Sequence, residues 1–199
     1  MKVALIGGSF NPPTKMHGKM GAEILRLKLV DEVWYIPSNR HPFADIQASK
    51  SRRAPYDVRC DLVAALIQDM AASNPETNGR LRLCVVERDM EGECYTKNVV
   101  ERLRALYRDI DFLWVTGTDC VADFPKWKYI DWVLENVPLI VYPRAGYPYT
   151  GNLGPKHFII PETAVYTEAV SSTQVRKGSE DLLTPEVCRY WRDVRKLSA

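Results

Sequence analysis

Apolar runs alternate along the chain with segments of helical periodicity. The runs predict six strands, at Lys2–Ile6, Glu32–Ile36, Leu81–Val86, Ile110–Thr116, Leu139–Tyr142 and His157–Ile160. Apolar residues spaced three and four apart predict helices at about His17–Leu29, Val58–Met70, Thr96–Tyr107 and Pro185–Lys196. Near-continuously apolar strands must be buried on both faces, so the pattern predicts the α/β class, a parallel sheet with helices on both faces. We expect a single domain, residues 1–199, with a small C-terminal helical part.

The connections carry most of the unusual residues. Ser38–Pro55 mixes Asn, Arg, His, Pro and Lys without a period, which predicts a long surface loop, and such loops in compact domains are usually functional. Ser73–Gly79 predicts a polar turn. Thr184 stands directly before Pro185 and is the expected N-cap of the last helix.

Composition excludes several classes of protein. The chain has 199 residues, 46% of them hydrophobic, and 27 Lys and Arg against 25 Asp and Glu give a net charge of +2. This balance argues against disorder and a nucleic-acid partner. No apolar run approaches the roughly 20 residues that span a bilayer, so we expect a cytoplasmic protein without a membrane partner. The five cysteines include no C-x-x-C pair, and we expect them to be reduced, without a metal site.

The first predicted strand runs into the segment GGSFNPPTKMH, Gly7–His17. Ligands of open parallel sheets bind beyond the carboxyl ends of the strands, where Gly7 and Gly8 allow close approach to a phosphate and the next helix adds its positive end. Thr14 and His17 are three apart and share a helical face. The spacing matches neither the dinucleotide fingerprint nor the Walker loop, and a plain structural turn is the alternative.

A second candidate anion site is the segment VSSTQVR, Val170–Arg176. It predicts an apolar strand that leads into a helix start with three hydroxyl residues, Ser171, Ser172 and Thr173. Arg176 lies one turn further and its guanidinium suits a phosphate. The alternative is an N-cap cluster beside a solvated arginine. Two such segments in one α/β chain favour phosphate binding.

These segments resemble the (H/T)xxH and ISSTxxR signatures of the nucleotidyltransferase superfamily. Three elements between them resemble the nicotinate-nucleotide adenylyltransferases: Glu87 with Glu93–Thr96, Gly117–Asp119 with Phe124–Trp127, and Pro143–Tyr147. The Asp119-to-Trp127 spacing of eight is similar to that of bacterial members. The resemblance covers Lys2 to about Leu183 and implies a Rossmann-like fold. The first signature reads T-x-M-H, as in eukaryotic nicotinamide-mononucleotide enzymes, and Ser38–Pro42 replaces the bacterial P-P-H-K loop.

The resemblance implies transfer of AMP from ATP to nicotinate mononucleotide, with Mg²⁺ carried on the substrate. The implied catalytic residues are His17, Thr14 and Arg176. The residues that it implies bind ATP are Gly7, Gly8, Ser9, Phe10, His17, Asp119, Ser171, Ser172, Thr173 and Arg176. Those that it implies bind the mononucleotide are Ser9, Phe10, Tyr95, Thr96, Trp127, Arg144 and His41. The attacking phosphate is already ionised at pH 7, which explains why no general-base constellation stands out.

Several alternatives stay open at this point. Nicotinamide mononucleotide, or both mononucleotides, could be the acceptor. A sister transferase acting on phosphopantetheine or a cytidine nucleotide is less compatible with Tyr95, Thr96 and Trp127. A noncatalytic nucleotide-binding domain is less compatible with intact Thr14, His17 and Arg176. Trp127 could also be a core residue, Asp119 a strand-end cap, and a homo-oligomer is left open.

Overall fold

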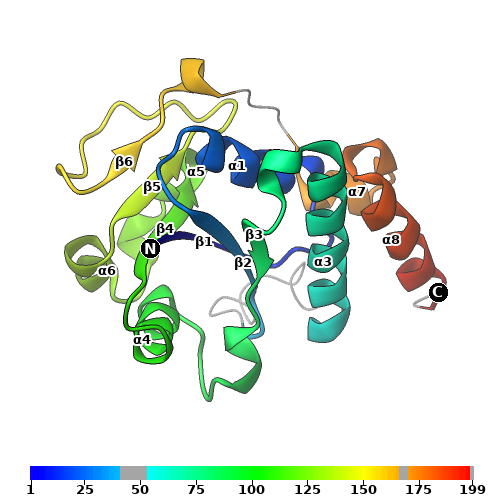
Figure 1. Cartoon of the computed structure of the whole chain (residues 1–199), viewed down its shortest axis with the longest axis horizontal. Coiled ribbons are helices and arrows are strands. Elements are labelled where there is room, and N and C mark those ends of the chain that lie inside the picture. Colours follow the sequence, from blue (N-terminus) through cyan, green and yellow to red (C-terminus); the bar gives the residue numbers. More distant parts are fainter. Residues whose placement is uncertain (41–52, 166–169, 198–199) are drawn as a thin grey trace.

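A six-stranded parallel sheet forms the centre of the computed structural model, which describes residues 1–40, 53–165 and 170–197 (Figure 1). The strand order is β3-β2-β1-β4-β5-β6, and every neighbouring pair is parallel. The strands are β1 Lys2–Gly8, β2 Glu32–Pro37, β3 Leu81–Leu83, β4 Asp111–Gly117, β5 Leu139–Tyr142 and β6 Phe158–Ile159. The predicted α/β class and parallel sheet are confirmed.

The helices cover both faces and one end of the molecule. They are α1 Lys15–Arg26, α3 Tyr56–Ser73, α4 Thr96–Leu106, α5 Thr118–Val121, α6 Ile130–Asn136, α7 Ser172–Arg176 and α8 Pro185–Leu197. Single 3₁₀ turns occur at η1 Pro75–Thr77, η2 Val86–Asp89, η3 Phe124–Lys126, η4 Glu162–Ala164 and η5 Glu180–Leu182. The three longest predicted helices before α8 each agree with an observed one to within three residues at either end.

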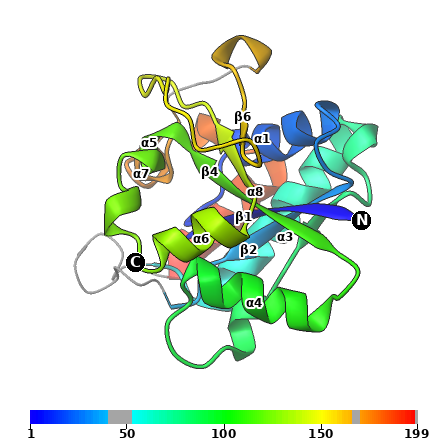
Figure 2. The ribbon, with the colours of Figure 1, turned by 90° about the vertical axis from the view of Figure 1, so that its left-hand side faces the viewer.

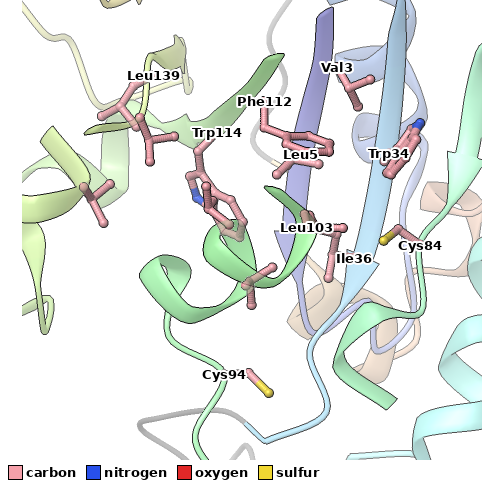
Figure 3. Close-up of a cluster of buried hydrophobic side chains, with 14 of the residues drawn as sticks. Val3, Leu5, Trp34, Ile36, Cys84, Cys94, Leu103, Phe112, Trp114 and Leu139 are labelled. Atoms are coloured by element: carbon pink, nitrogen blue, oxygen red, sulfur yellow. The ribbon is translucent and has the colours of Figure 1, made fainter. Parts of the chain in front are cut away.

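Successive residues of each central strand enter opposite layers of the core. Val3 and Leu5 of β1 belong to a cluster with Phe112 and Trp114 of β4, and Figure 3 shows these side chains near Leu103 of α4. Ala4 and Ile6 belong to the cluster on the other face, which α1 and α3 cover. This alternation explains why the strands read as unbroken apolar runs. Helices α4 and α6 lie on the first face (Figure 2).

The C-terminal helices pack on α3 instead of on the sheet, at one end of the molecule in Figure 1. Leu62 and Leu66 of α3 contact Val175 of α7 and Val187 and Trp191 of α8, and all five are buried. This third cluster is the small C-terminal helical part that the sequence predicts. It also places α7 against the loop before α1, so that Ser172 and Arg176 contact Pro12 and Asn11 near the N-terminus.

Several sequence predictions were wrong in detail. The third strand ends at Leu83, because the chain turns at η2, where the Arg88 N–H donates to the Val85 carbonyl at 2.9 Å. Thr184 does not cap α8, since its buried Oγ1 has no hydrogen-bond partner among the described residues. The carboxylate of Asp69 in α3 accepts the Glu186 N–H at 2.9 Å instead. Val170 and Ser171, the described residues directly before α7, are not in a strand.

The cysteines are all free thiols, with Cys60, Cys84 and Cys94 buried, as expected. Among the described residues, no helix combines the length and apolar character required to cross a bilayer.

Candidate active site

The candidate site lies at the carboxyl ends of β1 and β4. The strand order reverses between these two strands, and loops leaving a sheet at such a point part to opposite sides and open a crevice. Gly8 ends β1 and Gly117 ends β4, so the segments that follow them share this edge. The segment after β1 carries Thr14 and His17, and the segment after β4 carries Asp119.

The two glycines at the end of β1 make room for aromatic rings. A Cβ added to Gly7 would lie 2.7 Å from the Trp114 ring, and one added to Gly8 would lie 3.2 Å from the Phe10 ring. Phe10 is buried and packs edge-on against His17, with ring centroids 5.1 Å apart. The glycines therefore serve the packing beneath the site, and the buried Phe10 ring is part of that packing.

Side chains from distant elements hold the carbonyls of the loop between β1 and α1. The Arg176 guanidinium donates to the Asn11 carbonyl at 2.8 Å, and the Ser172 hydroxyl donates to the Pro12 carbonyl at 2.8 Å. Buried Arg59 of α3 donates to the Ser9 carbonyl at 2.9 Å. The two segments singled out in the sequence, 160 and more residues apart, are thus in direct contact.

Thr14 fixes the orientation and the tautomer of His17. The Thr14 backbone N–H donates to Nδ1 of His17 at 2.9 Å, and the Thr14 hydroxyl lies 2.8 Å from the same nitrogen. An amide N–H is only a donor, so Nδ1 is the acceptor and the proton of the neutral ring is on Nε2. Thr14 is fully buried, so it acts through His17. The tyrosine hydroxyl of Tyr35 adds a bond to the His17 carbonyl at 2.9 Å.

The surroundings of His17 favour the uncharged ring. Burial, and after it the positive charge of Arg144, lower the pKa of His17 to about 4. At neutral pH the ring is therefore a neutral hydrogen-bond donor, held in one tautomer before any ligand arrives. A preorganised donor of this kind stabilises negative charge on an oxygen without having to reorient.

Asp119 and Arg144 form an ion pair beyond the carboxyl ends of β4 and β5. The Arg144 guanidinium lies 3.1 Å from Oδ2 of Asp119, and the Arg144 N–H donates to the Thr118 hydroxyl at 2.9 Å. Oδ1 of Asp119 is buried and has no hydrogen-bond partner among the described residues. A Cβ at Gly117 would collide with that oxygen, so Gly117 is required for its position. A buried acceptor without a partner is costly unless a ligand donates to it, as a ribose hydroxyl would.

A group of aromatic residues surrounds the start of α4. Tyr95 is the N-cap residue of α4, Thr96 is its first residue, and the ring of Tyr129 packs against Tyr95 with centroids 5.7 Å apart. Lys128 lies 5.0 Å above the Tyr95 ring. Trp127 is half-buried and packs edge-on against Phe124 at 5.0 Å, so it contacts the core and keeps an accessible surface.

Of the remaining predicted site residues, two lie at the start of α7 and one lies outside the described residues. Ser171 and Thr173 lie at α7, where the Ser171 hydroxyl accepts the Gln174 N–H and the Thr173 hydroxyl accepts from Arg176. His41 lies outside the described residues. Among those that are described, no group of three or more His, Cys, Asp or Glu side chains is arranged to hold a metal ion.

Arg59 was missed by the sequence interpretation. It stands at the helical spacing of the apolar residues Leu62, Val63 and Leu66, and it is only 2% exposed. A charged residue on the apolar face of a helix was the available signal, since such residues are almost never buried without a partner.

Comparisons with known proteins agree with this geometry. The cytidylyltransferase-like family model matches residues 5–178. A probable nicotinate-nucleotide adenylyltransferase of Myxococcus xanthus is 33% identical over 97% of this chain and 93% of its own length. One from Salinibacter ruber is 31% identical over 99% of this chain and 97% of its own.

The chain belongs to the cytidylyltransferase-like family, in its nicotinate-nucleotide adenylyltransferase branch. The fold also matches the Plasmodium falciparum nicotinic acid mononucleotide adenylyltransferase complexed with APC, with a TM-score of 0.77 and 17% identity over 98% of this chain and 96% of that one. The suspected family is therefore confirmed, and this adenylyltransferase is an enzyme of the nucleotidyltransferase class.

The state of His17 in this adenylyltransferase gives a prediction. Since burial and Arg144 lower its pKa to about 4, the His17 ring should stay neutral and keep the Nε2–H tautomer between about pH 5.5 and 8, where ordinary histidines titrate. Imidazole ¹⁵N shifts, assigned with the His17→Gln variant, measure this directly. A midpoint near the ordinary value, or a proton on Nδ1, would contradict the described hydrogen bond from Thr14.

Proposed function

We propose that the protein transfers AMP from ATP to nicotinate mononucleotide, giving nicotinate adenine dinucleotide and pyrophosphate. The observation that carries the proposal is the contact of α7 with the loop after β1, through Arg176 and Asn11 and through Ser172 and Pro12. It gathers the hydroxyl and guanidinium donors around His17 at the edge of the sheet where ligands bind. Residues 1–199 act as one unit in this proposal, because α3 packs on both the sheet and the C-terminal helices.

The chemistry requires positioning more than acid–base catalysis. A 5′-phosphate oxygen of the mononucleotide attacks the α-phosphorus of ATP, a new P–O bond forms, and the bond to the bridging oxygen of the β-phosphate breaks. Pyrophosphate leaves with that electron pair. The attacking phosphate is already an anion, so no proton has to be removed. The protein has to align the two phosphates and offset the negative charge that gathers between them.

His17 is the proposed donor to the α-phosphate. Its Nε2–H is free of the Thr14 contact, which occupies Nδ1. Thr14 is then a positioning residue and not a group that touches the phosphate. The charge of Arg144, which His17 experiences, adds a cation on the same side.

Arg176, Ser172 and Thr173 are the proposed partners of the departing phosphates. The guanidinium of Arg176 uses one N–H for Asn11 and another for Thr173, which leaves further donors of its planar fork for phosphate oxygens. Arg176 is half-buried, so its position is fixed while its outer edge stays accessible. We propose that Mg²⁺ would be held by ATP and water, with no carboxylate cage from the protein, and would offset part of the phosphate charge, as this ion prefers oxygen ligands and retains water.

Asp119 is the proposed partner of a nucleotide ribose, through its unpaired Oδ1. The start of α4 is the proposed site of the pyridine ring. This 11-residue helix presents backbone N–H groups at Tyr95 and Thr96. Trp127 supplies a flat apolar surface for the ring. Lys128 adds positive charge beside Tyr95. This environment contains donors and cations, which suit the carboxylate of the nicotinate form better than a neutral amide.

The direct test is pyrophosphate release with ATP, Mg²⁺ and either nicotinate or nicotinamide mononucleotide. We expect strong preference for the nicotinate form, and a loss of about 100-fold or more in turnover for His17→Ala, as for other preorganised donors. Equal rates with both mononucleotides would replace the proposal with dual specificity. A decrease of less than about threefold for His17→Ala would reject its role in the chemistry.

The role of Trp127 is tested by Trp127→Ala. Loss of ring stacking should weaken mononucleotide binding by about 1–3 kcal/mol, with little change in the KM for ATP. Trp132→Ala is the matched control, because Trp132 is a half-buried tryptophan on the same core cluster. If the two variants lose stability equally and neither changes the mononucleotide KM, Trp127 is only a core residue.

A further inference from the structure

The carboxylate of Glu87 is buried beneath the carboxyl edge of the sheet. Glu87 lies in η2, directly after β3, and is 3% exposed. Its Oε2 accepts the Asn39 backbone N–H at 2.8 Å, and the Asn39 side-chain amide donates back to the Glu87 carbonyl at 3.2 Å. Asn39 follows the end of β2, next to Ser38, whose N–H donates to the Gly8 carbonyl at 2.8 Å. Glu87 therefore fixes the loop that leaves β2 next to the end of β1.

The same carboxylate also contacts the segment that precedes α4. The buried thiol of Cys94 is an electrostatic neighbour of the Glu87 carboxylate, and Cys94 stands directly before Tyr95 and Thr96. One buried carboxylate thus joins the loop after β2 to the start of α4. Both segments border the region proposed above for the mononucleotide.

The charges around Glu87 come from several elements. Arg59 of α3 and Arg53 in the segment before it act on Glu87, and the other titratable groups that face it are Tyr56, Cys84 and Cys94. Arg59 of α3 also donates to the Ser9 carbonyl of the loop after β1. The arginine that holds this loop is therefore an electrostatic neighbour of buried Glu87 in η2. No ion pair within 4.0 Å joins them in the described structure.

Retaining this carboxylate costs stability. Burial raises the pKa of Glu87 to about 7, in spite of the bond from Asn39, the neighbouring Cys94 thiol and the charges of both arginines. The pKa of Glu87 in the folded state is above the ordinary 4.5, so the folded state favours the protonated carboxyl. The contribution of Glu87 to the free energy of unfolding therefore falls as the pH rises from about 4.5 to about 7. An uncharged side chain in a purely structural role would avoid the free-energy cost of burying a charge.

We propose that Glu87 is a positioning residue of the mononucleotide site, whose carboxylate holds Asn39 and lies beside Cys94, and thereby sets the start of α4 at Tyr95 and Thr96. The inference rests on the proposed function, because that function assigns the mononucleotide to this region. An ionised carboxylate only accepts hydrogen bonds, which suits the Asn39 N–H beside it. Glutamine of nearly the same shape has one accepting oxygen, and its NH₂ group would face Asn39 or Cys94 in place of the second oxygen.

The test compares Glu87→Gln with the wild type in steady-state kinetics. We expect the KM for the mononucleotide to rise about tenfold, the effect of one lost bond to a charged group, while the KM for ATP stays within about twofold. Thermal unfolding at pH 8 should show equal or higher stability for the variant. Below about pH 7 the wild-type kcat/KM for the mononucleotide should fall more steeply than that of the variant, because only the wild type has Glu87 to protonate. Ionisation of the substrate affects both proteins equally.

Glu32→Gln is the matched control. Glu32 is also a largely buried carboxylate, bonded to Trp34 at 2.7 Å and to Arg82 at 2.9 Å, but it begins β2 at the opposite edge of the sheet. This variant should lose stability and leave both KM values unchanged. Equal KM changes for ATP and the mononucleotide in Glu87→Gln, or a loss of stability without a change in KM, would overturn the inference.

Hydrogen exchange separates this inference from the proposed function, because it requires no substrate. The amides of Asn39, bonded to Glu87, and of Val99, bonded to the Tyr95 carbonyl, should exchange faster in Glu87→Gln and at the wild-type rate in Glu32→Gln. If the wild type shows no pyrophosphate release with nicotinate mononucleotide while these amides behave as expected, the proposed function fails and the positioning contact stands. Unchanged exchange at both amides would reject the positioning role.

Discussion

The site depends on how the carbonyl groups of the loop between β1 and α1 are satisfied. Ser9, Asn11 and Pro12 each receive a hydrogen bond from a side chain outside the loop, from Arg59, Arg176 and Ser172 respectively. Only the Ser9 carbonyl is followed by a residue with an N–H, Phe10, because prolines follow Asn11 and Pro12. In a trans peptide the carbonyl and the next N–H point in opposite directions, so the bond from Arg59 to Ser9 leaves the Phe10 N–H pointing away from Arg59. The packing of α3 against α7 and α8 fixes the geometry of the bonds from Arg176 and Ser172, and the bond from Arg59 comes from α3 itself. The cluster of α3, α7 and α8 thereby shapes the loop that we propose meets the ligand.

The charges of the site follow from the reaction proposed for it. Both substrates are anions, so the protein needs donors and cations and has no use for a general base. His17 is held neutral as a donor, while Arg176 and Arg144 supply cations at the accessible edge. The carboxylates present have other partners: Asp119 pairs with Arg144 through one oxygen, and Glu87 is buried and accepts from Asn39. In the proposed site Asp119 meets a ribose and Glu87 positions the start of α4, so neither carboxylate would face the phosphates.

The hydrophobic pattern was sufficient to predict the fold class, because strands buried on both faces leave a strong signal in the sequence. The short helices α5 and α6 were not predicted, since segments of four and seven residues carry too few positions for a period to show. Candidate ligand residues were found where glycines or hydroxyls cluster at strand and helix ends. The partners that position them could not be found this way: Arg59 and Asp69 act through contacts between elements, and nothing local marks which carbonyl or N–H each will meet. Thr184 shows the converse, a good local cap signal that a tertiary contact replaced.

The central claim is that the segments Gly7–His17 and Val170–Arg176 form one phosphate site around His17. A crystal structure of the enzyme with a nonhydrolysable ATP analogue, Mg²⁺ and nicotinate mononucleotide tests it most directly. We predict an α-phosphate oxygen within hydrogen-bond distance of Nε2 of His17, and the β- and γ-phosphates on the Arg176 guanidinium. Phosphates bound away from the ends of β1 and β4, or an α-phosphate that contacts neither His17 nor the β1 loop, would contradict the account.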